Sequence, residues 1–281
     1  MLLIEKEQIQ EDARKAHQIE LEHLYNKNQT LRRIRKEFTD CKDPDLARYM
    51  RTKGIDPEFG FDLLVQMALH KRTMLPTMVG ILRQHFDDSQ KTADMILACA
   101  EADLVDWSEN LQQLIVKINI SQDVQDDLDR YQYPLPMVIP PKPVLDNRDT
   151  GYYVTARDSI ILRKNHHEDD VCLDHINRVN NTKFSVNLDT AMMIKNAWRN
   201  LDKQKPGETQ ADFERRVRAF DKYDRTAKEV IQLVIQYGNE FYLTHRYDKR
   251  GRIYCQGYHI NYQGASWNKA VIELADKEVV P

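Results

Sequence analysis

The sequence lacks several features that would assign a chain of 281 residues to a narrow class. Its four cysteines are far apart and form no Cys-x-x-Cys pair, which argues against a zinc site and against a disulfide framework. No run approaches the roughly 18 apolar residues of a membrane span, and the N-terminus becomes charged at Glu5, unlike a signal peptide. The sequence therefore predicts a protein of a reducing, cytoplasmic setting, with no membrane partner.

A strong net charge is also lacking, because 41 lysines and arginines stand against 44 aspartates and glutamates. A nucleic-acid-binding protein of this composition must group its cations on one face. Grouping is visible at residues 32–36 and 215–218, in contrast to the acidic run at 123–129. Taken alone, each run is typical of a solvated helix face.

One short segment, residues 247–254, combines an acid, three cations, a glycine and two tyrosines. The flanking runs 241–245 and 253–258 are rich in aromatic and β-branched residues, which predicts a hairpin with Gly251 near its tip. Such a hairpin would hold Arg250 and Arg252 on rigid backbone, and planar guanidinium groups suit phosphate oxygens. The alternative is an ordinary solvated hairpin tip.

Apolar periodicity predicts a long helix over residues 5–38 and further helices at 61–70, 76–86 and 89–103. The first 130 residues or so are therefore expected to be mainly helical, and they contain no internal repeat.

Prolines at 133–136 and 140–143 force an extended backbone, which suits a rigid crossing between subdomains. A plain linker or a proline-rich ligand remains the alternative. A short hairpin of residues 152–155 with 160–162 is expected to follow.

Histidines and acids at residues 166–170, with Asp174 and His175 beyond, are residue types that bind zinc or magnesium. Adjacent side chains on one backbone rarely converge on one ion, and a helix beginning near Asp170 would favour acids in its first turn. No metal is assigned to this segment.

Two long helical patterns, residues 186–203 and 209–237, are separated by a break at 205–208, and a capping box at 209–212 opens the second. We expect them to form an antiparallel helical hairpin. Cations recur along the second helix at intervals of three or four, and alone they form only a polar face: Arg215, Arg218, Lys222, Arg225 and Lys228.

The segment Asp248-x-x-Gly251-Arg252 resembles the D/T-x-x-G-R motif of the single-subunit RNA polymerases of the phage and mitochondrial type. Residues 259–269 resemble the family's F-N-P-Q-G-x-x-x-x-K stretch, with Tyr262 in place of the proline. Residues 137–143, followed by 150–153, resemble its V-P-P-K-P and G-G-Y-W segments, and residues 179–187 resemble its Q-N-T-x-W-x-I-N helix. The four matches fall in the family's order over roughly the last half of the chain, which is more specific than one short motif.

The resemblance, together with the periodicity, implies a mainly α fold with short β-hairpins, of the α+β class. Residues 1–145 would form an N-terminal helical domain and 146–185 a hairpin and connecting helix. Residues 186–238 would form a thumb-like helical hairpin that flanks the RNA:DNA hybrid. Residues 239–281 would be the first part of a polymerase palm.

By the same resemblance, Arg252 would contact the template strand or the hybrid, with Asp248 and Arg250 bracing the loop. Tyr254 would lie against the template, and Gly251 would provide backbone clearance. Weaker candidates for contacts to the nucleic-acid backbone are Lys142, Arg225 and Lys228.

The family places its two metal-binding aspartates beyond the point that corresponds to Pro281. We therefore expect either a fragment or the small subunit of a two-chain enzyme of this family, as in podophages resembling coliphage N-four. The partner chain would bind Mg²⁺ and catalyse DNA-directed RNA synthesis as a nucleotidyltransferase in the cytoplasm of the infected bacterial host, with no catalytic residue in this chain. The partner would also cover an apolar tail within residues 260–280.

The expected ligands are the DNA template and the nascent RNA, and a recruiting or single-strand-binding factor would help the enzyme to start on duplex DNA. Two other classes remain open. One is a stand-alone single-strand-binding module that assists another polymerase, and the other is a structural adaptor that docks a protein through its hairpin.

Overall fold

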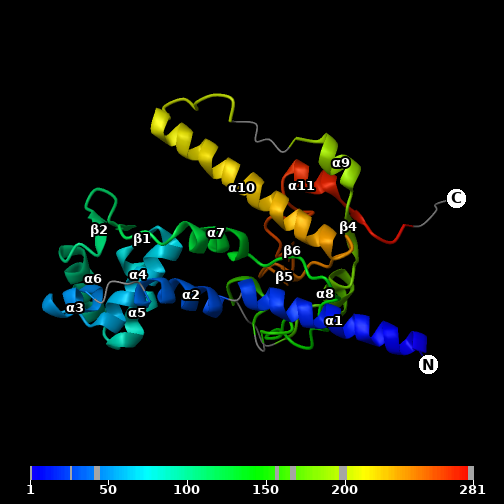
Figure 1. Cartoon of the computed structure of the whole chain (residues 1–281), viewed down its shortest axis with the longest axis horizontal. Helices are drawn as coiled ribbons and strands as arrows, with labels where there is room; N and C mark the ends of the chain where they lie inside the picture. Colours follow the sequence, from blue (N-terminus) through cyan, green and yellow to red (C-terminus); the bar gives the residue numbers. More distant parts are fainter. Residues whose placement is uncertain are drawn as a thin grey trace. The chain divides into compact units, whose positions relative to one another are not determined.

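The computed structural model describes residues 2–25, 27–40, 45–155, 158–164, 169–195 and 201–277, and the fold is of the α+β class, with small antiparallel sheets (Figure 1). The chain divides into two compact units. Unit 1 comprises residues Met1–Tyr25 and Tyr133–Pro281, and unit 2 comprises Asn26–Gln132. Among the described helices, none has the length and apolar character needed to cross a bilayer.

Unit 2 is built from helices around one small sheet. Its strands are β1 (Arg72–Met74), β2 (Val105–Ser108) and β3 (Gln113–Val116), in the antiparallel order β1-β3-β2. Its helices are α2 (Lys27–Thr39), α3 (Asp45–Thr52), α4 (Pro57–His70), α5 (Leu75–Leu82), η1 (Arg83–His85), α6 (Ser89–Glu101) and α7 (Gln122–Tyr131). Their apolar faces form one cluster, whose fully buried members include Phe59, Leu63, Met67, Ile96 and Leu114.

The helices expected at 61–70, 76–86 and 89–103 are confirmed as α4, α5 with η1, and α6. Each of α4 and α6 starts at an aspartate whose carboxylate accepts backbone N–H groups of the first turn, Asp56 for α4 and Asp88 for α6. The single long helix expected over residues 5–38 is wrong. The structure has α1 (Leu2–Tyr25) and α2 there, and the two belong to different units.

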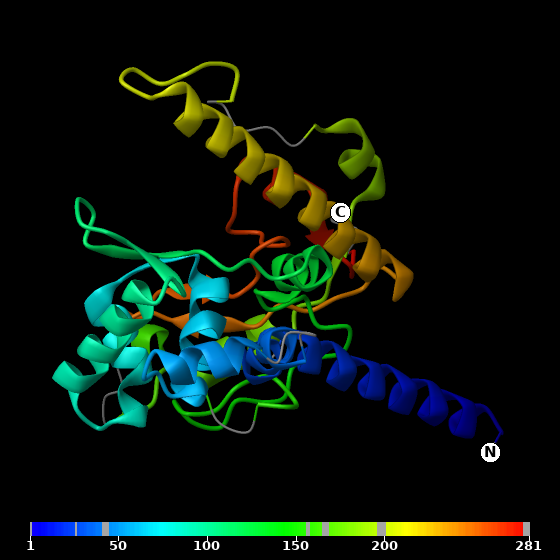
Figure 2. The ribbon, with the colours of Figure 1, turned by 60° about the vertical axis from the view of Figure 1, so that its left-hand side comes forward.

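Unit 1 combines α1 with elements from the second half of the chain. Its helices are η2 (Leu162–Lys164), α8 (Leu173–Asn180), α9 (Leu188–Met193), α10 (Gln210–Gln236) and α11 (Ser266–Val271). Its strands are β4 (Phe184–Val186), β5 (His245–Tyr247), β6 (Ile253–Cys255) and β7 (Ile272–Leu274), with β4 paired to β7 and β5 to β6. The long helix α10 (Figure 2) confirms the pattern at 209–237. Its N-cap is Thr209, whose hydroxyl accepts the N–H of Asp212 as the capping box predicts.

The hairpin expected from residues 152–155 and 160–162 is not formed by the described residues of these runs. The N–H groups of Tyr153 and Val154 donate to the carboxylate of Glu22 on α1, at 3.0 and 2.7 Å, so they are not free to pair with a second strand. Ile161 instead forms a parallel β-bridge with Tyr247 of β5. Arg157, at the expected turn, lies outside the described residues.

Two other expected helices are also corrected. The resemblance places a helix over residues 179–187, but α8 ends at Asn180 and the chain then extends into β4, where the N–H of Phe184 donates to the carbonyl of Phe241 at 2.8 Å. The helix expected over 186–203 is reduced to α9, after which Ile194 is extended. Residues 196–200 lie outside the described part, so the long antiparallel hairpin with α10 is not seen in the described residues.

The apolar tail expected to need a partner is partly covered by the chain itself. Ile260, Trp267 and Val271 are buried within unit 1, whereas Leu274 is exposed. Val279 and Val280 lie outside the described residues. The short helix α11 explains this difference, because Trp267 and Val271 are four residues apart and share one face, which packs inward.

Candidate nucleic-acid interface

The D-x-x-G-R-like segment forms the expected hairpin. Strands β5 and β6 pair with Tyr247 opposite Ile253, and the N–H of Asp248 donates to the carbonyl of Arg252 at 2.8 Å. The N–H of Gly251 donates to the carbonyl of Asp248 at 3.0 Å, and Gly251 has a φ of +78°. A tight turn followed by one left-handed residue is a common three-residue hairpin loop. The positive φ favours glycine here, because side chains with a Cβ rarely adopt it, whereas the space around Gly251 would itself admit a Cβ.

Asp248 is the internal anchor of the loop. One carboxylate oxygen accepts the backbone N–H groups of Arg250 and Arg252 at 2.8 and 3.0 Å. The other accepts Nε of Arg252 at 2.9 Å and Nη2 of Arg250 at 3.1 Å. The hydroxyl of Tyr254 lies 3.4 Å from the same oxygen. One acid thus fixes both the turn and its two guanidinium groups.

The two arginines nevertheless remain available to a ligand. The Arg250 side chain is 62% exposed and the Arg252 side chain 53%, whereas Asp248 is only 14% exposed. The guanidinium of Arg252 also lies 5.6 Å from the centre of the Tyr254 ring. With Lys249, the loop carries three cations against one carboxylate. It can therefore present preorganised donors to an anion, and it needs little rearrangement to do so.

The pKa of the Asp248 carboxyl reflects this arrangement. Removal from water favours the neutral acid, but hydrogen bonds from the backbone and guanidinium of Arg252, and the hydroxyl of Tyr254, together outweigh that effect. The pKa of Asp248 is therefore below its ordinary value, and the carboxylate stays ionised as the anchor of the loop.

The segment that resembles F-N-P-Q-G forms hydrogen bonds to both strands of the hairpin. The amide of Gln263 accepts the N–H of Cys255 at 2.8 Å and donates to the carbonyl of Ile253 at 3.2 Å. The Tyr262 hydroxyl lies 2.9 Å from Nε2 of His245, and Nδ1 of that histidine lies 2.9 Å from the side-chain oxygen of Asn180. His245 therefore links β5 to two other motif segments.

The remaining motif segments meet at Gly151. A Cβ at this glycine would lie 2.9 Å from Cβ of Pro141, 3.3 Å from Cγ2 of Thr244 and 3.6 Å from the Asn180 amide nitrogen. The next residue, Tyr152, makes a 2.7 Å hydrogen bond with the hydroxyl of Thr244. All four segments of the resemblance therefore contact the run 241–247 or residues directly bonded to it.

The weaker candidate residues lie elsewhere in unit 1. The Lys142 N–H donates to the carbonyl of Gly151 at 2.8 Å, so its backbone braces the junction. On α10, Lys228 pairs with Asp224 at 2.6 Å. Arg225 also has an interaction partner. The contacts of Lys142 and Lys228 are thus made with residues outside the hairpin at 247–254.

The cations of the stripe along α10 are exposed, with the Arg215 side chain at 60% and the Arg218 side chain at 68%, but these two pair with acids of their own helix. Arg215 pairs with Asp212 at 3.1 Å and Arg218 with Glu214 at 3.7 Å, both along the same helix. Such solvated pairs are weak and exchange readily. They support a polar helix face, as the spacing alone indicated.

Among the residues that the structure describes, no group of three or more histidine, cysteine or acidic side chains converges. His166, His167 and Glu168 lie outside the described residues. Asp174 occupies the first turn of α8, as expected from the helix dipole, and Asp170 accepts the N–H of Asn147 at 3.1 Å.

Sequence reasoning missed the side chains that hold the hairpin in place. Asp158 pairs with Arg246 of β5, and the Tyr247 hydroxyl lies 2.6 Å from Nδ1 of His175. No local sequence pattern indicates these two contacts, because each joins residues that are distant in sequence. No protein-family model and no curated protein matches this chain.

Proposed function

We propose that this chain is the non-catalytic subunit of a heterodimeric DNA-directed RNA polymerase of the single-subunit type. Its hairpin loop contacts the template strand or the RNA:DNA hybrid, and a partner chain supplies the Mg²⁺-binding carboxylates for nucleotidyl transfer. The observation that supports the proposal is the anchored loop. Asp248 holds the guanidinium groups of Arg250 and Arg252 in fixed positions while leaving both exposed.

The convergence of the motif segments adds a second argument. Four segments that resemble one family in order need not touch, yet here they contact the hairpin strands and the run before them, through Gly151 and His245 at 241–247 and through Gln263 at β6. A common function for the four segments accounts for this convergence. In the proposed enzyme, Tyr254 lies against the template beside Arg252.

The test is RNA synthesis by the chain co-expressed with its candidate catalytic partner. Arg252→Ala removes an exposed guanidinium without opening a core, so assembly persists while affinity for template or hybrid falls by about 1–3 kcal/mol. Arg83→Ala in unit 2 is the matched control, since Arg83 is similarly exposed and its pairing with Asp87 at 3.9 Å is weak. The isolated chain is expected to make no RNA.

Normal transcription and normal retention of short RNAs by an assembled Arg252→Ala enzyme would contradict the role of the loop. Template-dependent synthesis by the rigorously purified chain alone would contradict the non-catalytic assignment. The enzyme is also expected to start on single-stranded or pre-melted DNA and to need a recruiting factor on closed duplex. Efficient, sequence-specific initiation on linear duplex without a helper would contradict that expectation.

A second candidate function is a stand-alone accessory protein that binds single-stranded nucleic acid. The observation that favours it is the ring of Tyr258, which is 44% exposed and stacks on Tyr133 with 3.9 Å between ring centroids. An exposed aromatic ring such as Tyr258 provides a stacking platform for a base without any enzyme partner. Tight oligonucleotide binding together with no RNA synthesis in any co-expressed pair would favour this candidate.

A further inference from the structure

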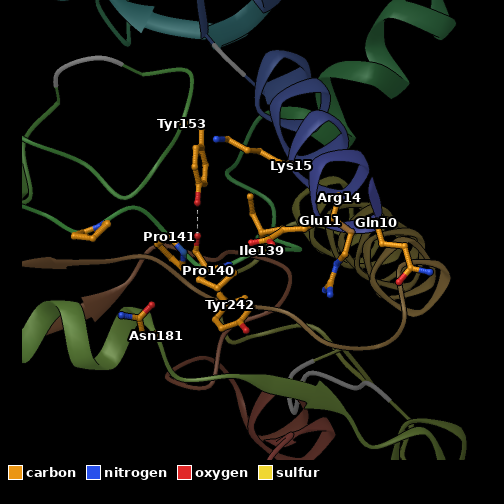
Figure 3. A pocket seen from close by; sticks show the side chains of 11 residues that line it. Gln10, Glu11, Arg14, Lys15, Ile139, Pro140, Pro141, Tyr153, Asn181 and Tyr242 are labelled. Carbon is orange, nitrogen blue, oxygen red and sulfur yellow. Dashed lines mark hydrogen bonds between the residues drawn. The ribbon is translucent and has the colours of Figure 1, made fainter. Parts of the chain in front are cut away.

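Unit 1 contains a cavity of about 650 Å³ between the N-terminal half of α1 and the proline-rich segment (Figure 3). Its walls include Arg14 and Lys15 from α1, Pro140 and Pro141, and the rings of Tyr153 and Tyr242. The cavity is separate from the hairpin, since none of the residues 248–254 lines it.

The wall formed by α1 is fixed by buried polar contacts. Gln18 accepts the N–H of Val138 at 2.8 Å and donates to Glu22 at 3.0 Å, and both side chains are almost fully buried. Glu22 in turn accepts the N–H groups of Tyr153 and Val154. The helix and the two loop segments are thus tied together beside the cavity, which is preformed rather than assembled by a ligand.

The opposite wall presents flat apolar faces. The Tyr153 hydroxyl donates to the carbonyl of Pro140 at 2.8 Å, which fixes the ring as Figure 3 shows. Pro140, Pro141 and Pro143 line the cavity, whereas Lys142 does not. A planar group can therefore stack against an ordered tyrosine ring.

Charged and amide side chains also line the cavity. The Lys15 ammonium lies 5.8 Å from the centre of the Tyr153 ring, and Arg14 donates one Nη2 bond to the carbonyl of Val138 at 2.8 Å. Glu11, Gln10 and Asn181 also line the cavity and supply carboxylate and amide oxygens together with amide donors. Paired donors and acceptors next to cations match the edges of a nucleobase and its phosphate.

We infer that this cavity binds a segment of single-stranded nucleic acid, with one base against Tyr153 and the adjacent phosphate at Lys15 and Arg14. The inference goes beyond the hairpin, and it rests on the proposed function in choosing a nucleic acid over an acidic peptide as the occupant. It gives the chain a second contact with a single strand, independent of the Asp248 loop.

The experiment uses the purified full-length chain and a fluorescein-labelled twelve-nucleotide oligouridine, with binding followed by anisotropy. Lys15→Glu and Tyr153→Leu are each expected to weaken binding about tenfold, and Tyr153→Phe, which keeps the ring, to stay within about twofold of the wild type. Lys53→Glu is the matched control because Lys53, in unit 2, makes the same kind of contact, 5.6 Å from the Tyr49 ring. It imposes the same change in net charge.

Crosslinking of an oligomer that carries 4-thiouridine, followed by mass spectrometry, locates the contact. Adducts in peptides that contain residues 10–15 or 139–153 support the inference. It is overturned by equal effects of Lys15→Glu and Lys53→Glu, or by adducts confined to other peptides. A peptide of twelve glutamates that competes as well as unlabelled oligouridine also overturns it, because the cavity would then recognise charge alone.

The hairpin variant separates this inference from the proposed function. If Lys15→Glu weakens oligouridine binding while Arg252→Ala leaves RNA synthesis normal, the cavity binds a single strand and the role of the loop is wrong. If Arg252→Ala abolishes synthesis while Lys15→Glu binds oligouridine like Lys53→Glu, the loop acts as proposed and the cavity does not bind nucleic acid.

Discussion

The two units of this chain are stabilised in different ways. Unit 2 has an extensive apolar cluster between regular helices and a small sheet, with Phe59, Leu63 and Met67 fully buried. Unit 1 has smaller apolar clusters among its described residues, and side-chain hydrogen bonds to distant backbone groups connect its irregular segments. The comparison indicates that periodic apolar sequence builds unit 2, whereas the candidate site depends on individual polar residues.

The largest difference in stability between the two units is expected at acidic pH. Burial, with a contribution from His175, lowers the pKa of His245 to about 4, and burial also lowers the pKa of His259 to about 4 although Glu229 opposes it. The unfolded chain takes up these protons below about pH 6.5. Stability is therefore complete above that pH and falls as the pH drops to about 4, by about 3 kcal/mol for each histidine.

Hydrogen exchange measured by mass spectrometry between pH 7 and pH 4, corrected for intrinsic rates, tests this prediction by unit. Peptides that cover residues 241–260 should lose protection earlier than those around α4. His259→Phe is the sharpest variant, because both ring nitrogens of His259 are buried and have no hydrogen-bond partner among the residues that the structure describes. It should remove about half of the pH dependence. Unchanged dependence in this variant would contradict the assignment to His259.

In unit 2 the strongest single disruption should be Phe59→Ala. Phe59 is fully buried, and its ring lies 5.3 Å from those of His85 and Phe86. Removing it leaves a cavity and should lower the free energy of unfolding by about 4 kcal/mol. Urea unfolding measures the loss, and Leu111→Ala, at a side chain that is 52% exposed, should stay within about 0.5 kcal/mol of the wild type. A loss below 1 kcal/mol for Phe59→Ala would show that the cluster does not determine stability.

In unit 1 the strongest disruption should come from the loss of a polar side chain, that of Glu22. Glu22→Ala removes the acceptor of the part-buried N–H groups of Tyr153 and Val154, and it should cost about 2 kcal/mol. Glu20→Ala is the matched control on the same helix, since the Glu20 side chain is 77% exposed and lies 3.6 Å from His17. Comparable small effects of both substitutions on urea unfolding would refute the view that polar contacts dominate unit 1.

A smaller effect is expected at the junction of the motif segments. Gly151→Ala places a Cβ within 2.9 Å of Pro141 and should cost up to about 2 kcal/mol by overpacking. Gly80→Ala in α5 meets no atom within 4 Å and should instead raise the free energy of unfolding by about 0.5–1 kcal/mol. Thermal unfolding of the two variants compares them directly. Equal melting temperatures would mean that the segments do not meet closely at Gly151.

The sequence allowed prediction of features whose signals are local. Helices α4, α6 and α10 follow from apolar periodicity and caps, and the hairpin at Gly251 follows from its strands and turn residues. The polymerase-like domains remain a prediction. The hairpin at 152–155 was wrong because its N–H groups bind Glu22, and no local pattern marks a helical glutamate as the acceptor for a loop so distant in sequence.

For the candidate site, too, the sequence allowed prediction of the residues that lie close together in the chain. Asp248, Arg250, Gly251, Arg252 and Tyr254 are brought together because they belong to one turn, whereas Lys142, Arg225 and Lys228 are not part of it. The cavity beside α1 was not foreseen. Its walls come from segments more than 120 residues apart, and their proximity depends on the buried Gln18 and Glu22.

The attachment of α1 also constrains the order in which the chain matures on the ribosome. Glu22 and Tyr153 are 131 residues apart, and the whole of unit 2 is encoded between them. At about 5–20 residues per second, synthesis of this interval takes on the order of ten seconds, and unit 2 can fold during that time. Until residues 138–154 are synthesised, Gln18 and Glu22 lack the backbone N–H groups that they bind in the folded chain. The first helix to be made is thus among the last to be secured, and a nascent chain stalled before Tyr153 would carry a folded insert beside an undocked helix.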